Sequence, residues 1–331
     1  MKRLRYIALA RLSLGKLLII RNKRKFNCAL LLVVLTLLFV ACEQGEFNPI
    51  AQGDPNAVKI NVFIGEMKTR VVYGENGETG FIVNDQIRVV NYTRVGRNKS
   101  DAVYKIDGYC NWLPVDNNNY LVWDGFGVNT FYGSYPATAS YVEFVLPTDQ
   151  SAGIASADWM TDDYEGVKSD SIVSFVFEHR LAKITLKVEW NTQYANTKQE
   201  ITGVNIYSKG SQFTAVYGID GVSIVAHDGF VAIEPWQNAD ASEFTAIVAP
   251  MVYSTMDKLM TFVVNGTDSL TVLANNLTLN GGLKAGCHYT FSLIVGKEAV
   301  DIADVNIIRW EELIVDGVET EEVNTIVSGG G

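Results

Sequence analysis

The histidines and two acidic clusters are the residues of this sequence with the greatest capacity for catalytic or metal chemistry. His179, His227 and His288 do not have the i, i+4 helical spacing that places two imidazoles on one metal ion. The stretches DNNNY (116–120) and TDDYE (161–165) offer oxygen ligands for Ca²⁺, but neither has the glycine of an EF-hand loop. The sequence also lacks a glycine-rich phosphate loop, a nucleophile elbow and an HExxH motif. We therefore predict a protein that is not an enzyme, with no catalytic residue, metal site or cofactor.

Cys42 is the one residue whose context predicts a covalent modification. A basic segment, RNKRKFN (21–27), precedes the unbroken apolar run ALLLVVLTLLFVA (29–41). This run is shorter than the roughly 20 residues that a membrane-spanning helix needs, so it indicates a cleaved export signal. A cysteine that directly follows a small residue at the end of such a run resembles a bacterial lipobox. We therefore predict a signal peptide over residues 1–42 and an acyl (palmitate) anchor on Cys42.

Charge is distributed unevenly along the chain. The first 42 residues hold nine Lys or Arg and no acid, so the remainder has 18 basic and 37 acidic residues and a net charge of 18 − 37 = −19. A body of this charge repels nucleic acid and anionic lipid surfaces. We therefore exclude nucleic acid as a partner.

Short runs of alternating apolar and polar residues fill the chain after residue 57 and predict β-strands. In the first run, Val58, Ile60, Val62 and Ile64 alternate with other residues, so one face of the predicted strand is wholly aliphatic. Turns rich in Gly, Asn and Asp separate the runs. Because no long helical period follows the signal, we predict an all-β protein.

The polar stretch MTDDYEGVKSDS (160–171) is the predicted junction between two domains. Beyond it, the run over residues 172–190 moves its apolar side chains to the other face near residues 178–182, which indicates a bulge or a crossing between sheets. The pattern predicts two β-sandwiches in series. The predicted organisation is a signal peptide (1–42), a flexible tether (43–56), an N-terminal sandwich (57–168), a C-terminal sandwich (169–312) and a tail (313–331).

Several motifs follow the lipobox and the first strand in a fixed order. They are FIVNDQIRVV (81–90), FYGSYPA (131–137), FVLPTDQS (144–151), ADWM (157–160), FVFEHRLAKITLKV (175–188), GCHYTFSLIVGK (286–297) and IIRW (307–310). The ordered set resembles the fimbrillin-like proteins, the pilins and pilus-associated lipoproteins of type V pili in Gram-negative bacteria. The resemblance implies two tandem transthyretin-like antiparallel β-sandwich domains and export to the outer membrane as a lipoprotein.

The resemblance also implies assembly by strand exchange. In polymerising members, an arginine-specific protease cuts after an Arg just past the first strand, and a carboxy-terminal strand of the next subunit fills the groove. Carried over to this sequence, the cut follows Arg70 and leaves Val71 as the new amino terminus, so strand 58–64 is the exchangeable one. Taken alone, an Arg after a strand and before a Gly-rich turn is usually a solvated turn residue.

The carboxy-terminal tail is the candidate donor strand. Two short β-prone pieces, LIVDGV (313–318) and VNTIV (323–327), flank the acidic ETEE (319–322). The acids are poorly suited to a dry groove, and an ordinary frayed tail is the alternative. The candidate donor side chains, which share one parity, are Leu313, Val315, Val323 and Val327.

We therefore expect a fimbrillin-type structural pilus subunit at the cell outer membrane, or in a fimbrium once polymerised. Its expected partners are other pilus subunits, through strand exchange, and outer-membrane lipid, through acylated Cys42. The alternative is a pilus tip or stand-alone surface lipoprotein. Such a protein acts as an adhesin for a host or bacterial surface receptor without polymerising.

Overall fold

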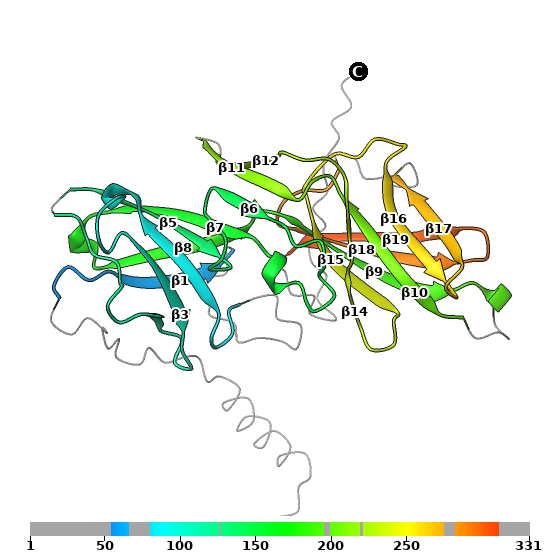
Figure 1. The fold of residues 1–331 in the computed structure, drawn as a ribbon, viewed down its shortest axis with the longest axis horizontal. Helices are drawn as coiled ribbons and strands as arrows, with labels where there is room; N and C mark the ends of the chain where they lie inside the picture. Colours follow the sequence, from blue (N-terminus) through cyan, green and yellow to red (C-terminus); the bar gives the residue numbers. More distant parts are fainter. Residues whose placement is uncertain are drawn as a thin grey trace, which may run out of the picture. The chain divides into compact units, whose positions relative to one another are not determined.

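The computed structural model describes residues 54–65, 80–125, 127–194, 199–218, 221–274 and 282–310. Within these ranges the chain forms strands β1 to β19 and short 3-10 helices, with no α-helix (Figure 1). The all-β class predicted from the alternating runs is confirmed. The 3-10 helices are η1 (Tyr92–Arg94), η2 (Ala155–Ala157), η3 (Lys168–Asp170) and η4 (Thr192–Tyr194).

A seven-stranded sheet contains the first strand of the chain at one of its ends. Alternate residues of β1, β2 and β3 are buried, so one face of the sheet covers a core while the other is more exposed. In spatial order its strands are β1 (Lys59–Ile64), β8 (Ile172–His179), β7 (Met160–Gly166), β5 (Asn129–Tyr135), β2 (Gln86–Asn91), β3 (Asp101–Ile106) and β4 (Trp112–Pro114).

Three smaller sheets contain the remaining strands. The five-stranded sheet is β14 (Trp236–Gln237), β15 (Glu243–Val248), β9 (Ala182–Trp190), β18 (Cys287–Val295) and β19 (Val300–Arg309). The four-stranded sheet is β13 (Val231–Ile233), β10 (Ile201–Ser208), β16 (Lys258–Val264) and β17 (Asp268–Leu273). The three-stranded sheet is β12 (Gly221–Ala226), β11 (Gln212–Gly218) and β6 (Glu143–Val145).

Among the described strands, two pairs are parallel, whereas antiparallel sandwiches were expected. β1 runs parallel to β8, and β9 runs parallel to β18. A parallel pair needs a long connection that returns the chain to the same end of the sheet. Most of the seven-stranded sheet lies between β1 and β8 in sequence and provides that connection. The alternation of apolar residues predicts which face is buried but carries no information on strand direction.

Two hydrophobic cores form, and we call them the first core and the second core. The first core lies on the seven-stranded sheet and includes Ile87, Phe131 and Phe175. The second core includes Trp159 and Phe291 and draws on all three smaller sheets. The chain passes from the seven-stranded to the five-stranded sheet between β8 and β9. The crossing expected near residues 178–182 is confirmed.

The predicted domain boundary between residues 168 and 169 does not follow the division between the two cores. Phe144 lies before this boundary and belongs to the second core, whereas Phe175 lies after it and belongs to the first. The polar stretch over residues 160–171, the predicted junction, contains β7 and η3. Its acids are frequent because alternate residues of β7, such as Asp163, lie on the exposed face of the sheet.

Candidate strand-exchange site

β1 lies at the end of the seven-stranded sheet and is hydrogen-bonded along its length to β8. The parallel register pairs Lys59 with Ile172 at one end and Ile64 with Phe177 at the other (Figure 1, β1 in blue beside β8). The backbone N–H of Gly65 extends the pairing, because it donates to the carbonyl of Phe177 at 2.8 Å. Gly65 has φ = 58°, a left-handed conformation that glycine adopts without strain, and β1 ends there.

The aliphatic face of the first strand is buried in the first core. Val58, Ile60, Val62 and Ile64 are 5%, 3%, 8% and 8% exposed, and all four belong to the first core. At about 1.5–3 kcal/mol for each fully buried side chain, their burial contributes on the order of 6–12 kcal/mol. The whole stability of a typical domain is about 5–15 kcal/mol. The first core without β1 would therefore be marginal.

Withdrawal of β1 would expose one edge of β8 and the apolar side chains beside it. On β8, Val173, Phe175 and Phe177 are all 0% exposed and lie opposite Ile60, Val62 and Ile64 of β1. The backbone edge of β8 that now pairs with β1 would also lose its partners. An unpaired edge that carries newly exposed apolar side chains is a template for another strand, whether by aggregation or by specific strand addition.

A second segment of the chain holds the start of β1 on its other side. The N–H of Val58 donates to the carbonyl of Leu121 at 2.9 Å, and the N–H of Trp123 donates to the carbonyl of Asn56 at 2.9 Å. A pocket of about 210 Å³ lies next to this contact and is lined in part by Val58, Tyr104 and Trp123. The start of β1 therefore has hydrogen-bonded neighbours on both sides. Within the sheet, the rest of the strand has only β8 as a neighbour.

Polar contacts anchor the residues that precede β1. Asp54 accepts a hydrogen bond from the hydroxyl of Tyr120 at 2.9 Å and lies 3.6 Å from Nζ of Lys99. The N–H of Asn56 and these two side chains lower the pKa of Asp54, although burial opposes them. Nζ of Lys168 donates to Oδ1 of Asn56 at 2.6 Å. This part of the predicted tether is thus attached to the connecting segments that contain Lys99 and Tyr120, and to η3.

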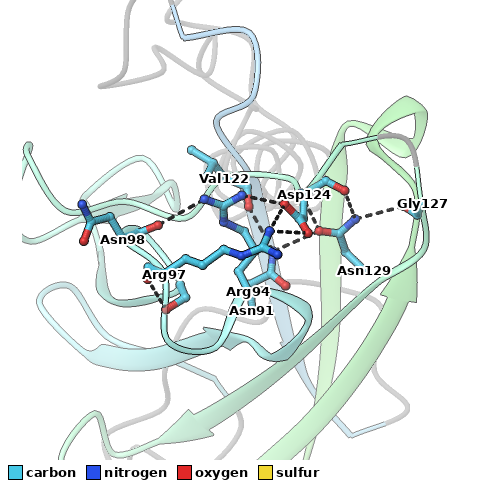
Figure 2. Close-up of polar contacts among 9 residues, drawn as sticks. Asn91, Arg94, Arg97, Asn98, Val122, Asp124, Gly127 and Asn129 are labelled. Atoms are coloured by element: carbon cyan, nitrogen blue, oxygen red, sulfur yellow. Dashed lines mark hydrogen bonds and ion pairs between the residues drawn. The ribbon is translucent and has the colours of Figure 1, made fainter.

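Asp124 fixes the segment that contacts the start of β1. Figure 2 shows two guanidinium groups converging on its carboxylate: Nη1 of Arg94 and Nη1 of Arg97 each lie 2.8 Å from Oδ1. Asn91 is fully buried, and its Nδ2 donates at 3.0 Å both to the carbonyl of Val122 and to Oδ1 of Asn129. This network, which we call the Asp124 network, was not predicted from sequence, because its members are far apart in the chain and no local pattern links them.

The three histidines lie in separate environments. Nδ1 of His179 lies 2.7 Å from Oδ1 of Asp158, and Nε2 of His227 lies 2.6 Å from the hydroxyl of Thr214. Nε2 of His288 lies 2.9 Å from the hydroxyl of Thr185, and burial, with the charge of nearby lysines, lowers the pKa of His288 to about 3. In the part of the chain that the structure describes, no group of three potential ligands is close enough to hold a metal ion.

Several predicted site residues fall outside the described ranges. They are the lipidation residue Cys42, the processing residues Arg70 and Val71, and the donor residues Leu313, Val315, Val323 and Val327. Of the predicted site residues, the structure therefore describes only those of the first strand. Within the described ranges, no helix has the length and apolar character needed to cross a membrane.

A family model described as fimbrillin-like matches residues 69–310, which begin after β1 and end at Trp310. The chain is similar to the crystal structure of a proposed cell adhesion protein from Bacteroides uniformis, with a TM-score of 0.58 and 16% identity, covering 77% of this chain and 97% of that one. It is also similar to one from Bacteroides ovatus, with a TM-score of 0.53 and 18% identity, covering 77% and 97%. At these identities the likeness shows a common fold. Among curated proteins, none matches.

Proposed function

The chain belongs to the fimbrillin-like family, and we propose that it is a structural pilus subunit that polymerises by strand exchange. In this proposal the protein reaches the outer membrane as a lipoprotein acylated on Cys42. Cleavage after Arg70 then releases β1, and residues 313–331 of the next subunit fill the vacated groove. The protein needs no catalytic residue of its own for these steps, because the cut is made by a separate protease.

The observation that carries the proposal is the place of β1 in the fold. It lies at the end of its sheet, it is the first strand after the predicted lipid anchor, and its buried face contributes a large share of the stability of the first core. Loss of such a strand would be destructive unless another strand replaced it. Parallel pairing is also slightly less stable per residue than antiparallel pairing, so a donor that entered antiparallel to β8 would be favoured.

A single conservative substitution tests the role of Arg70. Arg70→Lys keeps the charge and length of the side chain but removes the guanidinium that an arginine-specific protease recognises. We expect the lipidated Arg70→Lys protein to stay a longer monomer on the cell, whereas the wild type is shortened and polymerised. The matched control, Arg309→Lys, changes an exposed arginine on β19, outside the sheet that contains β1, and should be processed normally. Normal polymers from Arg70→Lys would contradict the proposal.

Deletion of residues 313–331 tests the donor role separately. The deleted protein should still be exported, cut and able to accept a donor, but it should not add its own strand to a neighbour. Mixed with the wild type, it should therefore end growing polymers and shorten them. If the polymers in the mixture kept their length, residues 313–331 would not be the donor strand.

One observation favours the alternative of a non-polymerising surface adhesin. The start of β1 is bonded to Leu121 and Trp123 on one side, and polar contacts hold Asp54 and Asn56 in front of it. These contacts oppose removal of the strand. If Arg70 remains uncut on the cell surface, they indicate a permanent β1 and a stand-alone lipoprotein.

A further inference from the structure

Four tyrosines gather on the seven-stranded sheet and beside it. The rings of Tyr132, on β5, and Tyr141, before β6, are stacked with centroids 4.3 Å apart and planes 11° apart. Tyr92, in η1, meets Tyr132 edge to face at 5.8 Å, and Tyr217, on β11, meets it edge to face at 5.3 Å. We call this group the tyrosine cluster.

The tyrosine cluster lies on the face of the sheet that points away from the first core. Phe131 and Gly133, the neighbours of Tyr132 on β5, are buried, so the alternation of the strand directs Tyr132 outward. Tyr92 is 56% exposed, and Tyr132, Tyr141 and Tyr217 are half-buried. The hydroxyl of Tyr217 donates to the carbonyl of Tyr141 at 2.8 Å, which fixes one side of the cluster. The rings thus form a rigid surface that is accessible from the side of Tyr92.

Two carboxylates border the tyrosine cluster. Asp163 of β7 lies directly opposite Tyr132 in the ladder, and Glu165 lies opposite Thr130, whose hydroxyl donates to it at 3.3 Å. Both carboxylates are exposed, and no Lys or Arg among the described residues forms an ion pair with either. The nearby Arg88 is paired with Asp101. Burial, and then the charge of Asp163, raise the pKa of Tyr132.

Electron-rich aromatic faces beside unpaired carboxylates are complementary to a cation. A Lys ammonium or Arg guanidinium within about 6 Å of a ring centroid is attracted by the ring quadrupole, and a neighbouring carboxylate adds to the attraction. Arg and Tyr are also common among the side chains that contribute most to protein interfaces. We propose that the tyrosine cluster, with Asp163 and Glu165, binds a Lys or Arg side chain that a partner protein presents in a basic segment.

The experiment measures binding of short peptides to the full mature chain. Oligoarginine and oligolysine peptides are titrated by calorimetry, with oligoglutamine as the neutral peptide and a panel of neutral oligosaccharides as the competing ligand class. We expect saturable binding of the cationic peptides that weakens as salt is added, because the carboxylates are exposed. The neutral peptide should not bind.

Two kinds of variant assign the binding to these residues. We expect Tyr92→Leu and Tyr132→Leu, and separately the pair Asp163→Asn with Glu165→Gln, to weaken binding about three- to thirtyfold. The matched controls are Tyr109→Leu, at a tyrosine that is 70% exposed in another turn, and the exposed pair Asp301→Asn with Asp304→Asn on β19. Both controls should bind as the wild type does.

Three results would overturn the proposal. One is no saturable binding of either cationic peptide. The second is binding that falls with the carboxylate variants but not with Tyr92→Leu, which would reduce the site to general charge attraction. The third is tighter binding of a neutral oligosaccharide that does not depend on Asp163 and Glu165. Because Tyr92 is exposed and in a surface turn, Tyr92→Leu keeps the test valid even if Tyr132→Leu disturbs the packing of β11.

Discussion

Val62 of β1 lies opposite Phe175 of β8 in a parallel ladder, and both side chains are buried in the first core, at 8% and 0% exposure. The pair joins β1, the first strand that the structure describes, to a strand more than 100 residues further along the chain. The buried faces of β1 and β8 therefore belong to one packed core. Substitutions on the buried face of either strand should therefore lower the stability of the whole first core.

Ile60→Ala should lower the free energy of unfolding by about 2–5 kcal/mol, because it empties a fully packed site on the inner face of β1. Urea denaturation of the uncut protein measures this. The matched control is Ile82→Ala, at an isoleucine that is 51% exposed, where the change should stay within about 0.5 kcal/mol. Equal effects of the two substitutions would mean that β1 is not packed as described.

Asp124→Asn should loosen the start of β1 without unfolding the sheet. It removes the carboxylate that Arg94 and Arg97 share, and because the side chain of Arg97 is 61% exposed, the two contacts together should contribute about 1–3 kcal/mol. We expect faster hydrogen exchange at the N–H groups of Val58 and Trp123, which bond across the contact. Asp304→Asn, at an exposed position on β19, is the control. If the hydrogen-exchange rates of both amides were unchanged, the Asp124 network would not stabilise the start of β1.

His288 should make the protein less stable in mild acid. Its pKa is lowered to about 3 in the folded protein, chiefly by burial, against about 6.5 when unfolded, so the unfolded state binds more protons between these values. Stability should therefore be fully present above about pH 6.5 and should fall as the pH drops toward 3. His288→Gln should remove this part of the dependence.

The pH test compares His288→Gln with the wild type, since another group acts in the opposite direction. Burial raises the pKa of Asp162 to about 6, so its contribution to stability is present in acid and is lost as the pH rises through about 6. Both proteins retain Asp162, and the difference between their denaturation midpoints at pH 7 and pH 5 isolates His288. An identical pH dependence in the two proteins would contradict the assigned burial of the imidazole.

The sequence predicted the features of the fold that depend on local pattern. The alternation at Val58 to Ile64 predicted β1 and its buried face, and the shift of apolar parity near residues 178–182 predicted the passage from β8 to β9. Features that depend on pairing over long distances were missed. The parallel direction of β1 is one, and the return of Phe144 to the second core is another.

In the candidate site, too, local features were predicted from the sequence and long-range contacts were not. The first strand and its buried face were predicted from the strand's own residues, but the contact of Val58 with Leu121 and the convergence of Arg94 and Arg97 on Asp124 were not. The tyrosine cluster also joins residues as distant as Tyr92 and Tyr217, which share no motif. Such contacts arise when strands are placed side by side, and a single sequence does not encode their partners in any local spacing.

The amino-terminal residue of the subunit in purified surface polymers is the most direct test of strand exchange. If residues 42–70 are removed before polymerisation, the subunits should have an unblocked amino terminus at Val71 and no acylated peptide attached. Polymers whose subunits still begin at acylated Cys42 and retain β1 would contradict strand exchange.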